Sequence, residues 1–283
     1  MSTNALNKKI VLWVILILLA INLTPNYAIG ITVEKGKLYF VGIGPAGPEM
    51  ATLQAIEIIK QADVIFAPKY IQDPFQEYLK GKDVRLAWPD SVYMVDGKLY
   101  TTMDSKEKLK RLGRAIMKHA ASLSNQFKKE MSQGKSVALL VNGDPCLYSD
   151  LRWFKRYFSD SDFEVIPGMS SFNAGAALFK VDLTQPRGIN TVIIHSPIAG
   201  VSEIRQLAKH QVTMVFFMAG RLKAIVKELK REYDGDTPIA LAYYIGYPTK
   251  QKVIKGTLNT ILRDTKAEPE TDMFLIYVGE FME

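Results

Sequence analysis

Short apolar runs alternate with amphipathic stretches along most of the chain, and several apolar runs end in loops of Gly, Pro, Asp or Ser. The first run covers residues 37–43 and stops at a cluster of Gly and Pro over 42–48. The apolar spacing over 53–62 then predicts a helix, and the β-rich run 63–67 predicts a second strand. This order predicts a strand–helix–strand unit, in which ligands bind beyond the carboxyl ends of the strands.

Similar units follow in the next 120 or so residues. An apolar stripe predicts a helix over 104–134 that ends at Gly134. The continuous apolar run 136–141 has the length of a buried parallel strand. We expect another strand at 163–166 and then a helix of small residues over 174–179, capped by Ser170 or Ser171.

The pattern restarts beyond residues 181–190, which contain Pro and Gly but few apolar residues and which we interpret as a linker. Residues 88–102 show no clear period and are interpreted as loop and short strands. Strands are predicted at 191–194, 213–218, 238–244 and 273–278, and helices at 201–209 and 221–233. The alternation predicts two α/β domains with mainly parallel central sheets, over 31–186 and 187–283.

Residues 1–30 follow a different pattern. Lys8 and Lys9 precede an uninterrupted apolar run over 10–21, and polar residues follow it. The run is shorter than the about 20 residues that span a bilayer, so it is typical of a signal-peptide core. Ala28 and Gly30 offer a small-x-small cleavage site, and an uncleaved anchor is the alternative. We therefore expect membrane contact through residues 10–28, or export if the segment is cleaved.

Composition narrows the function classes. The 283 residues are 48% hydrophobic and 23% charged, as in ordinary globular proteins. The net charge of +7 favours an acidic partner, but no dense Lys/Arg block predicts nucleic acid. The single Cys146 excludes an intrachain disulfide, and His195 and His210 lack zinc-ligand spacing, so no metal is expected.

Three glycines match the dinucleotide fingerprint G-x-G-x-x-G, namely Gly42, Gly44 and Gly47. Pro45 and Pro48 hold this backbone in an open loop, and the helix is expected to begin near Glu49, so the third glycine does not lie inside it. Asp63 stands at the start of the second strand, whereas the ribose-binding acid follows the end of that strand. An NAD(P)-binding oxidoreductase is therefore the less favoured alternative.

The run 41–49, with Thr52-Leu53 and Ala62-Asp63-Val64 after it, resembles the opening of the tetrapyrrole methylases, which are S-adenosylmethionine-dependent enzymes of corrinoid and sirohaem synthesis. The resemblance extends from about residue 36 to the C-terminus. Residues 142–149 resemble the family's Gly-Asp-Pro-x-x-Tyr signature. The pairs Pro68-Lys69 and Tyr148-Ser149 are most similar to the precorrin-2 C20-methylating branch.

The resemblance implies a cleft between the two domains, a homodimer, and C-methylation of a tetrapyrrole-like (precorrin or corrinoid) acceptor. It also implies a methionine, Met218, that packs on the adenosine. The residues implied to bind S-adenosylmethionine are Gly44, Pro45, Asn142, Gly143, Asp144, Leu147, Ser170, Ser171, Met218, Ala240, Ile245 and Thr257.

A methyl donor of this kind carries a sulfonium cation and no phosphate, so it needs backbone carbonyls, small residues and an apolar slot. In-line methyl transfer depends mainly on holding donor and acceptor at near-attack distance, and a base only removes a proton afterwards. The sequence does not single out that base. The candidates are Lys69, Asp144, Tyr148 and His195.

Basic residues suit an acceptor that bears several carboxylates. In the uroporphyrinogen-methylating branch, an acidic residue that is proposed to handle the substrate proton occupies the position of Pro68. Proline cannot take part in proton transfer, so this role cannot be carried over to the present chain. An exported or membrane-anchored relative that binds tetrapyrroles without catalysis is therefore the main alternative. The cations considered for acceptor contacts are Lys69, Arg152, Lys155, Arg156 and Arg187.

Overall fold

The computed structural model of the protein describes residues 32–89, 94–95, 98–99, 106–184, 190–268, 271 and 273–282. The chain divides into Met1–Thr32 and Val33–Glu283, and only the second unit is described below. The predicted signal peptide or anchor, most of the predicted loop 88–102, the boundary at 186/187 and Arg187 lie outside the described residues. Within these ranges, no helix combines the length and apolarity needed to cross a membrane.

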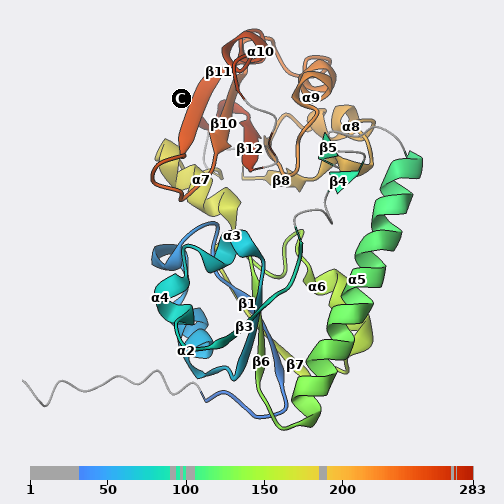
Figure 1. The fold of residues 1–283 in the computed structure, drawn as a ribbon. Coiled ribbons are helices and arrows are strands. Elements are labelled where there is room, and N and C mark those ends of the chain that lie inside the picture. Colours follow the sequence, from blue (N-terminus) through green and yellow to red (C-terminus); the bar gives the residue numbers. More distant parts are fainter. Residues whose placement is uncertain are drawn as a thin grey trace, which may run out of the picture. The chain divides into compact units, whose positions relative to one another are not determined.

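The first half of this unit forms a five-stranded parallel sheet with the order β3-β2-β6-β1-β7 (Figure 1). Its strands are β1 (Leu38–Gly42), β2 (Val64–Ala67), β3 (Asp83–Leu86), β6 (Val137–Val141) and β7 (Phe163–Ile166). All four pairings are parallel. The loops that leave the carboxyl ends of β1, β6 and β7 therefore share one edge of the sheet.

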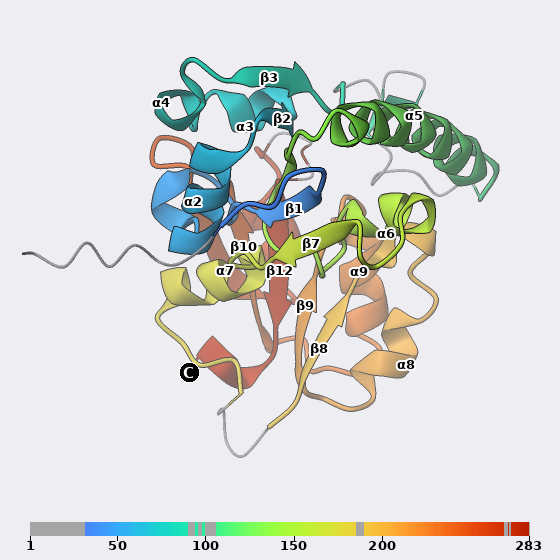
Figure 2. The same cartoon turned by 90° about the horizontal axis from the view of Figure 1, so that it is seen from below.

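Helices cover both faces of this sheet. α2 (Leu53–Gln61) and α4 (Gln76–Leu79) lie on one side of β1, and α5 (Lys106–Ser132) and α6 (Leu151–Phe154) lie on the other (Figure 2). Alternate strand residues such as Leu38, Phe40, Phe66 and Leu139 are fully buried against α5 and α6. The predicted helices over 53–62 and 104–134 are confirmed, and Thr52 Oγ1 caps α2 by accepting from Ala55 N at 3.0 Å.

The second half forms another five-stranded sheet with the order β11-β10-β12-β9-β8. Its strands are β8 (Val192–His195), β9 (Thr213–Phe216), β10 (Pro238–Tyr243), β11 (Lys252–Thr257) and β12 (Phe274–Val278). Only the β8–β9 pair is parallel, and the other three pairs are antiparallel. The prediction of a mainly parallel sheet is wrong here, since β10 turns directly back into β11, a connection that only antiparallel strands allow.

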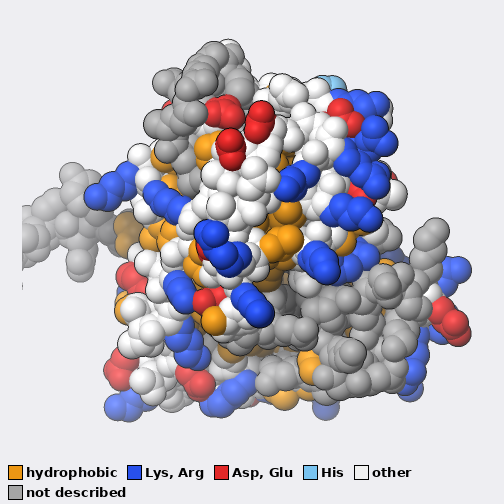
Figure 3. Space-filling view, turned by 90° about the horizontal axis from the view of Figure 1, so that it is seen from above, with side chains coloured by type: hydrophobic (Ala, Val, Ile, Leu, Met, Phe, Trp, Pro, Cys, Tyr) orange, Lys and Arg blue, Asp and Glu red, His pale blue; other side chains and the backbone are white. Residues whose placement is uncertain are grey.

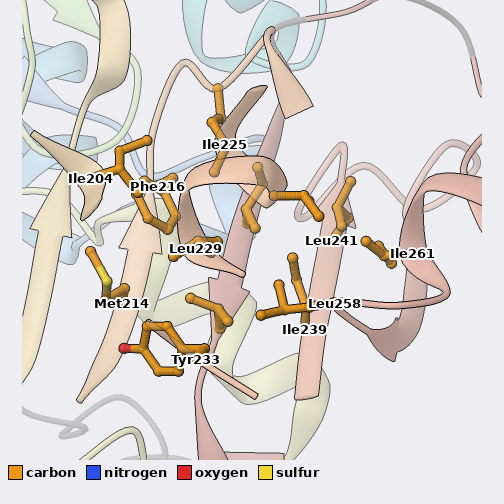
Figure 4. Packing of buried hydrophobic residues seen from close by; sticks show 14 of the residues in the cluster. Ile204, Met214, Phe216, Ile225, Leu229, Tyr233, Ile239, Leu241, Leu258 and Ile261 are labelled. Atoms are coloured by element: carbon orange, nitrogen blue, oxygen red, sulfur yellow. The ribbon is translucent and has the colours of Figure 1, made fainter. Parts of the chain in front are cut away.

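The two faces of the second sheet pack against different helices. One face lies against α8 (Ile204–Ala208), α9 (Leu222–Leu229) and α10 (Ile261–Asp264), where Phe216, Leu241 and their neighbours form the core of Figure 4. The other face packs against α7 (Ser171–Phe179), the helix that directly follows the loop after β7. The remaining short elements are η1 (Pro48–Met50), α3 (Lys69–Gln72), β4 (Met94–Val95), β5 (Lys98–Leu99), η4 (Lys155–Tyr157), η6 (Pro197–Ala199) and η7 (Glu280–Met282).

Several local predictions need correction. The strands β3 and β11 were not predicted, because their partly exposed and polar residues form no apolar run. The helix expected near Glu49 is the short η1, and α2 starts only at Leu53. The side chain of Ser170 makes no capping hydrogen bond with α7, although Ser170 occupies the N-cap position.

Candidate functional site

The loops after β1 and β6 are joined backbone to backbone. Gly143 N donates to Gly44 O at 2.8 Å, and Gly44 N donates to Gly143 O at 3.3 Å. With its side-chain amide turned so that the NH2 group faces these carbonyls, which is the orientation that satisfies both of its ends, Asn142 donates to Gly44 O at 3.1 Å and to Pro45 O at 3.2 Å. One junction is therefore formed by four residues that the resemblance implies, namely Gly44, Pro45, Asn142 and Gly143. They come from two segments about 100 residues apart in the sequence.

The loop after β7 packs on the same junction through glycines. A Cβ atom on Gly168 would lie 2.1 Å from Gly143 O and 2.7 Å from Gly42 C. A Cβ on Gly42 would lie 2.5 Å from Gly168 N. No side chain fits between these backbones, so all three loops meet at Gly42, Gly143 and Gly168. The sequence marks these glycines as loop residues but carries no signal of their mutual contact.

One side of this junction is open. Gly143 has a φ of +71°, and a Cβ placed on it would find no atom within 4 Å. The chain turns there, because Asp144 Oδ1 accepts from Cys146 N at 2.8 Å and Asp144 O accepts from Leu147 N at 3.2 Å. The neighbouring groups are thus backbone amides and carbonyls, a carboxylate and small residues.

Tyr148 extends from the loop after β6 to the second sheet. Its hydroxyl donates to Ile194 O at 3.2 Å, and its ring lies 5.2 Å from that of Phe217. Phe217 N in turn donates to His195 O at 2.9 Å, and Met218 is the next residue. These contacts connect three predicted site residues, namely Tyr148, His195 and Met218. Phe217 takes part in the contacts, although the sequence analysis did not predict it as a site residue.

Backbone strain gathers in the same loops. Tyr148, Met218 and Tyr244 have φ angles of 50°, 51° and 47°. Each such angle costs a residue other than glycine about 1 kcal/mol, and strain of this kind is concentrated at functional sites. The three residues follow β6, β9 and β10, whereas the other two described non-glycine residues with positive φ, Lys180 and Gln211, lie outside the site loops.

The loop after β10 packs on the loop after β1. A Cβ on Gly246 would lie 2.6 Å from Met50 Sδ and 2.8 Å from Ala46 Cβ. The preceding Ile245 is buried, and its Cδ1 lies 3.1 Å from the position of a Cβ on Gly175 of α7. Ile245 therefore lies beside both the first loop and α7.

Ala240 and Thr257 take different places from these loops. Ala240 is fully buried on the face of the second sheet that packs against α7. Thr257 pairs with Pro238, at the end of β10 opposite to Tyr243. The structure thus does not bring Thr257 to the junction, and its role in binding stays a prediction.

The cations considered for the acceptor have local partners. Lys69 pairs with Asp73 of the same helix turn at 2.8 Å, and both side chains are 66% exposed. The Arg152 guanidinium lies 4.4 Å from the Trp153 ring centroid, and Lys155 lies 4.0 Å from Asp160. Arg156 is exposed. These contacts do not assign any of them to an acceptor.

The loop segments themselves are free of basic residues. The segments 42–50, 142–149, 167–173, 217–220 and 244–248 contain no Lys or Arg, and their only acids are Glu49 and Asp144. This composition fits a cationic sulfonium ligand and offers no charged donor to a pyrophosphate. Gly47 precedes the short η1 rather than lying inside α2, so the helix terminus of the dinucleotide fingerprint is missing.

His195 is a partly buried histidine at the end of β8. Among the described side chains, His195 Nε2, Ser149 Oγ and Ser196 Oγ are buried polar atoms without a hydrogen-bond partner. Burial lowers the pKa of His195 below its ordinary value, which favours the neutral imidazole. A neutral imidazole can accept a proton, so His195 keeps its place among the candidate bases.

Replacing His195 with Gln is expected to flatten the acid side of the stability curve. As pH falls through about 6.5 the unfolded chain takes up a proton at this histidine while the native state does not, so the wild type loses stability. The measurement is urea denaturation of both proteins between about pH 5 and 8. His210→Gln, at an exposed position, is the matched control and should follow the wild-type curve. Parallel curves for His195→Gln and the wild type would contradict the expectation.

Residues 37–262 match the family profile of the Tetrapyrrole (Corrin/Porphyrin) Methylases. The chain belongs to this family. It is 30% identical to the cobalt-precorrin-4 C(11)-methyltransferase of Methanocaldococcus jannaschii, over 87% of this chain and 88% of that protein. It is 29% identical to the uroporphyrinogen-III C-methyltransferase of Priestia megaterium, over 87% of this chain and 98% of that protein. The crystal structure of a cobalt-precorrin-4 methyltransferase superposes with a TM-score of 0.69 at 23% identity, covering 88% and 96% of the two chains.

Membership in the tetrapyrrole methylases confirms the predicted enzyme class: the chain is a methyltransferase with S-adenosylmethionine as its cosubstrate. The branch prediction needs correction, because these relatives are named for precorrin-4 and uroporphyrinogen-III and not for precorrin-2 C20 methylation. The two dipeptides Pro68-Lys69 and Tyr148-Ser149 are too short to distinguish branches. The predicted homodimer and the predicted membrane contact stay predictions.

Proposed function

We propose that this tetrapyrrole methylase transfers the methyl group of S-adenosylmethionine to a ring carbon of a precorrin-type or uroporphyrinogen-type tetrapyrrole. The observation that carries the proposal is the junction of three strand-end loops at Gly42, Gly143 and Gly168, in a family member whose relatives are named for such acceptors. S-Adenosylmethionine supplies an electrophilic methyl group on a sulfonium cation.

The residues around the junction suit this cosubstrate. The open side of Gly143 offers space for it, and the loop carbonyls and the Asp144 carboxylate offer acceptors for its polar groups. Met218 and Ile245 contribute apolar surface from the second sheet. The strained backbone at Tyr148 and Met218 persists because the surrounding structure holds these residues in place before the cosubstrate binds. Groups that are positioned in advance hold donor and acceptor close together, and this proximity raises the rate of methyl transfer even without a base.

A Gly143→Ala variant should separate binding from folding. Its methyl group enters the open space beside the junction, so the affinity for S-adenosylhomocysteine should fall at least about tenfold, measured by calorimetry. The positive φ should also cost about 1 kcal/mol of stability. Gly81→Ala is the matched control, since Gly81 has a φ of +77° and equally open surroundings in the turn before β3. It should lose the same stability and no affinity. Equal affinities of the two variants would contradict the assignment.

The reaction itself is tested with the full-length protein, radiolabelled S-adenosylmethionine and uroporphyrinogen III or enzymatically prepared precorrin-4. Label in the ring fraction is the expected result. Tight binding of S-adenosylhomocysteine without transfer to either acceptor would refute the proposed acceptor class. Absence of binding would refute the donor site as well.

A further inference from the structure

A hollow of about 1040 Å³ lies far along the chain from the loop junction, between α9 and the segment that leads from β11 into α10. Its floor is aliphatic and consists of Leu222, Val226, Leu258 and Leu262. Val226 and Leu258 are each 1% exposed and belong to the buried core, in which Figure 4 labels Leu258, whereas Leu262 is 38% exposed. The apolar surface that a ligand can reach is therefore that of Leu262 and of the partly buried Leu222, and the volume of the hollow suits a molecule of considerable size.

The charged residues around this floor have one sign. The chain has 29 acidic and 36 basic residues, yet every charged residue that lines the hollow is basic. These residues are Arg221, Lys223, Lys227, Lys230 and Lys266. Figure 3 shows Lys and Arg side chains around hydrophobic ones on the face seen from above. The combination is an apolar floor inside a basic rim.

This arrangement costs stability in the absence of a ligand. Lys223 and Lys227 stand at i and i+4 in α9, where like charges destabilise a helix by about 0.2 to 0.5 kcal/mol per pair, and Lys230 follows at the C-cap. Lys223 also stands in the first turn of α9, where the helix dipole disfavours a cation. In the part of the chain that the structure describes, no carboxylate pairs with Lys223, Lys227 or Lys266. An anion bound in the hollow would offset this repulsion.

The other two rim cations are held in position. Lys230 Nζ donates to Asn259 Oδ1 at 2.6 Å, and the Arg221 guanidinium donates to the Pro197 carbonyl. The Arg221 guanidinium also donates to Ile198 O at 3.5 Å. All three acceptors are neutral oxygens, so these hydrogen bonds order the side chains without compensating their charges. Because these two side chains are already ordered, they lose less conformational entropy when a ligand binds.

We propose that this hollow binds an amphiphilic polyanion, namely an apolar ring system that carries several carboxylates. The apolar floor holds the ring, and the rim lysines pair with the carboxylates. A simple phosphate would leave the floor unused. The inference does not depend on the proposed methyl transfer, because Gly42, Gly143 and Gly168 do not line the hollow. The hollow and the candidate site share only the end of segment 217–220, since Gly220 is a lining residue.

The test is a fluorescence titration of the full-length protein, saturated with S-adenosylhomocysteine, with uroporphyrin I as the ring polycarboxylate. The Lys223→Glu/Lys227→Glu variant should lose one binding phase, with affinity reduced at least about tenfold. Leu262→Gln should weaken the same phase several-fold by removing floor contact. The matched control is Lys118→Glu/Lys129→Glu, which reverses two exposed lysines of α5 and should change nothing. Methyl transfer by the first variant should keep the wild-type rate, which separates this site from the reaction.

Three outcomes would overturn the proposal. The first is an unchanged titration in Lys223→Glu/Lys227→Glu, or an equal loss in the α5 control. The second is competition by tripolyphosphate as strong as that of the porphyrin, which would mark a nonspecific electropositive surface. The third is a concentration-dependent dimer that charge reversal dissociates, which would show that a second copy covers the hollow. If the double variant does not fold, the single substitution of the exposed Leu262 by Gln tests the proposal, and an unchanged titration of that variant would overturn it.

Discussion

The Gly168→Ala variant is expected to lose about 3 kcal/mol of unfolding free energy and most of its affinity for S-adenosylhomocysteine. The added Cβ would lie 2.1 Å from Gly143 O and 2.7 Å from Gly42 C. Both are backbone atoms at the ends of buried parallel strands, so they cannot move without shifting β1 or β6. The loop junction should therefore open, and the acceptors around Gly143 should lose their arrangement. Urea denaturation and calorimetric titration measure the two effects.

Gly113→Ala is the matched control for this substitution. Gly113 lies inside α5, and a Cβ on it meets nothing within 4 Å. Alanine has the higher helix propensity, so this variant should gain about 0.5 to 1 kcal/mol and bind normally. If Gly168→Ala behaved like Gly113→Ala, the three loops would not pack as tightly as described.

The second large effect is expected for Gly175→Ala in α7. A Cβ there would lie 2.0 Å from the Tyr277 hydroxyl, which donates to Phe172 O at 2.9 Å. Tyr277 is fully buried, and burial raises the pKa of its phenol, so the hydroxyl stays neutral and has no solvent to move into. Displacing it should cost about 2 to 3 kcal/mol, despite the about 1 kcal/mol that alanine gains in a helix.

A double-mutant cycle with Tyr277→Phe isolates this contact. Tyr277→Phe alone should cost about 1 kcal/mol for the lost hydrogen bond. It also removes the atom nearest to the new methyl group, although the ring carbon Cζ remains 2.9 Å away. The double variant should therefore be more stable than the sum of the single effects by at least about 1 kcal/mol, by urea denaturation. Additive effects would show that α7 shifts as a whole instead.

The part of the fold that follows from local pattern was predictable. β1 and β6 are continuous apolar runs, β7 is a short run interrupted only by Glu164, and all three end in Gly- and Pro-containing loops, so both signals are local. β3 and β11 were missed because strands at the edge of a sheet need no apolar run. The antiparallel order of the second sheet depends on which distant strands pair, and no local pattern encodes that choice.

The candidate site was predictable as a set of loops but not as a set of contacts. Family motifs identified Gly44, Asn142 and Met218. The contact of Gly168 with Gly143 depends on how loops from different strands approach one another, and the basic hollow beside α9 depends on where α10 packs. Thr257, which the resemblance implied as a binding residue, pairs with Pro238 at the other end of β10 from the loop after that strand, and its role in binding stays a prediction.

The strand order of the first sheet also determines when it can form during translation. β1 is hydrogen-bonded on both sides, yet its partners begin only at Val137 and Phe163. At about 5 to 20 residues per second, a ribosome takes several seconds to deliver them after Leu38. During that interval both edges of a fully apolar strand stay unpaired. The nascent chain thus depends on late synthesis to protect its earliest strand, and slow elongation before residue 166 would lengthen its exposure to chaperones and to aggregation.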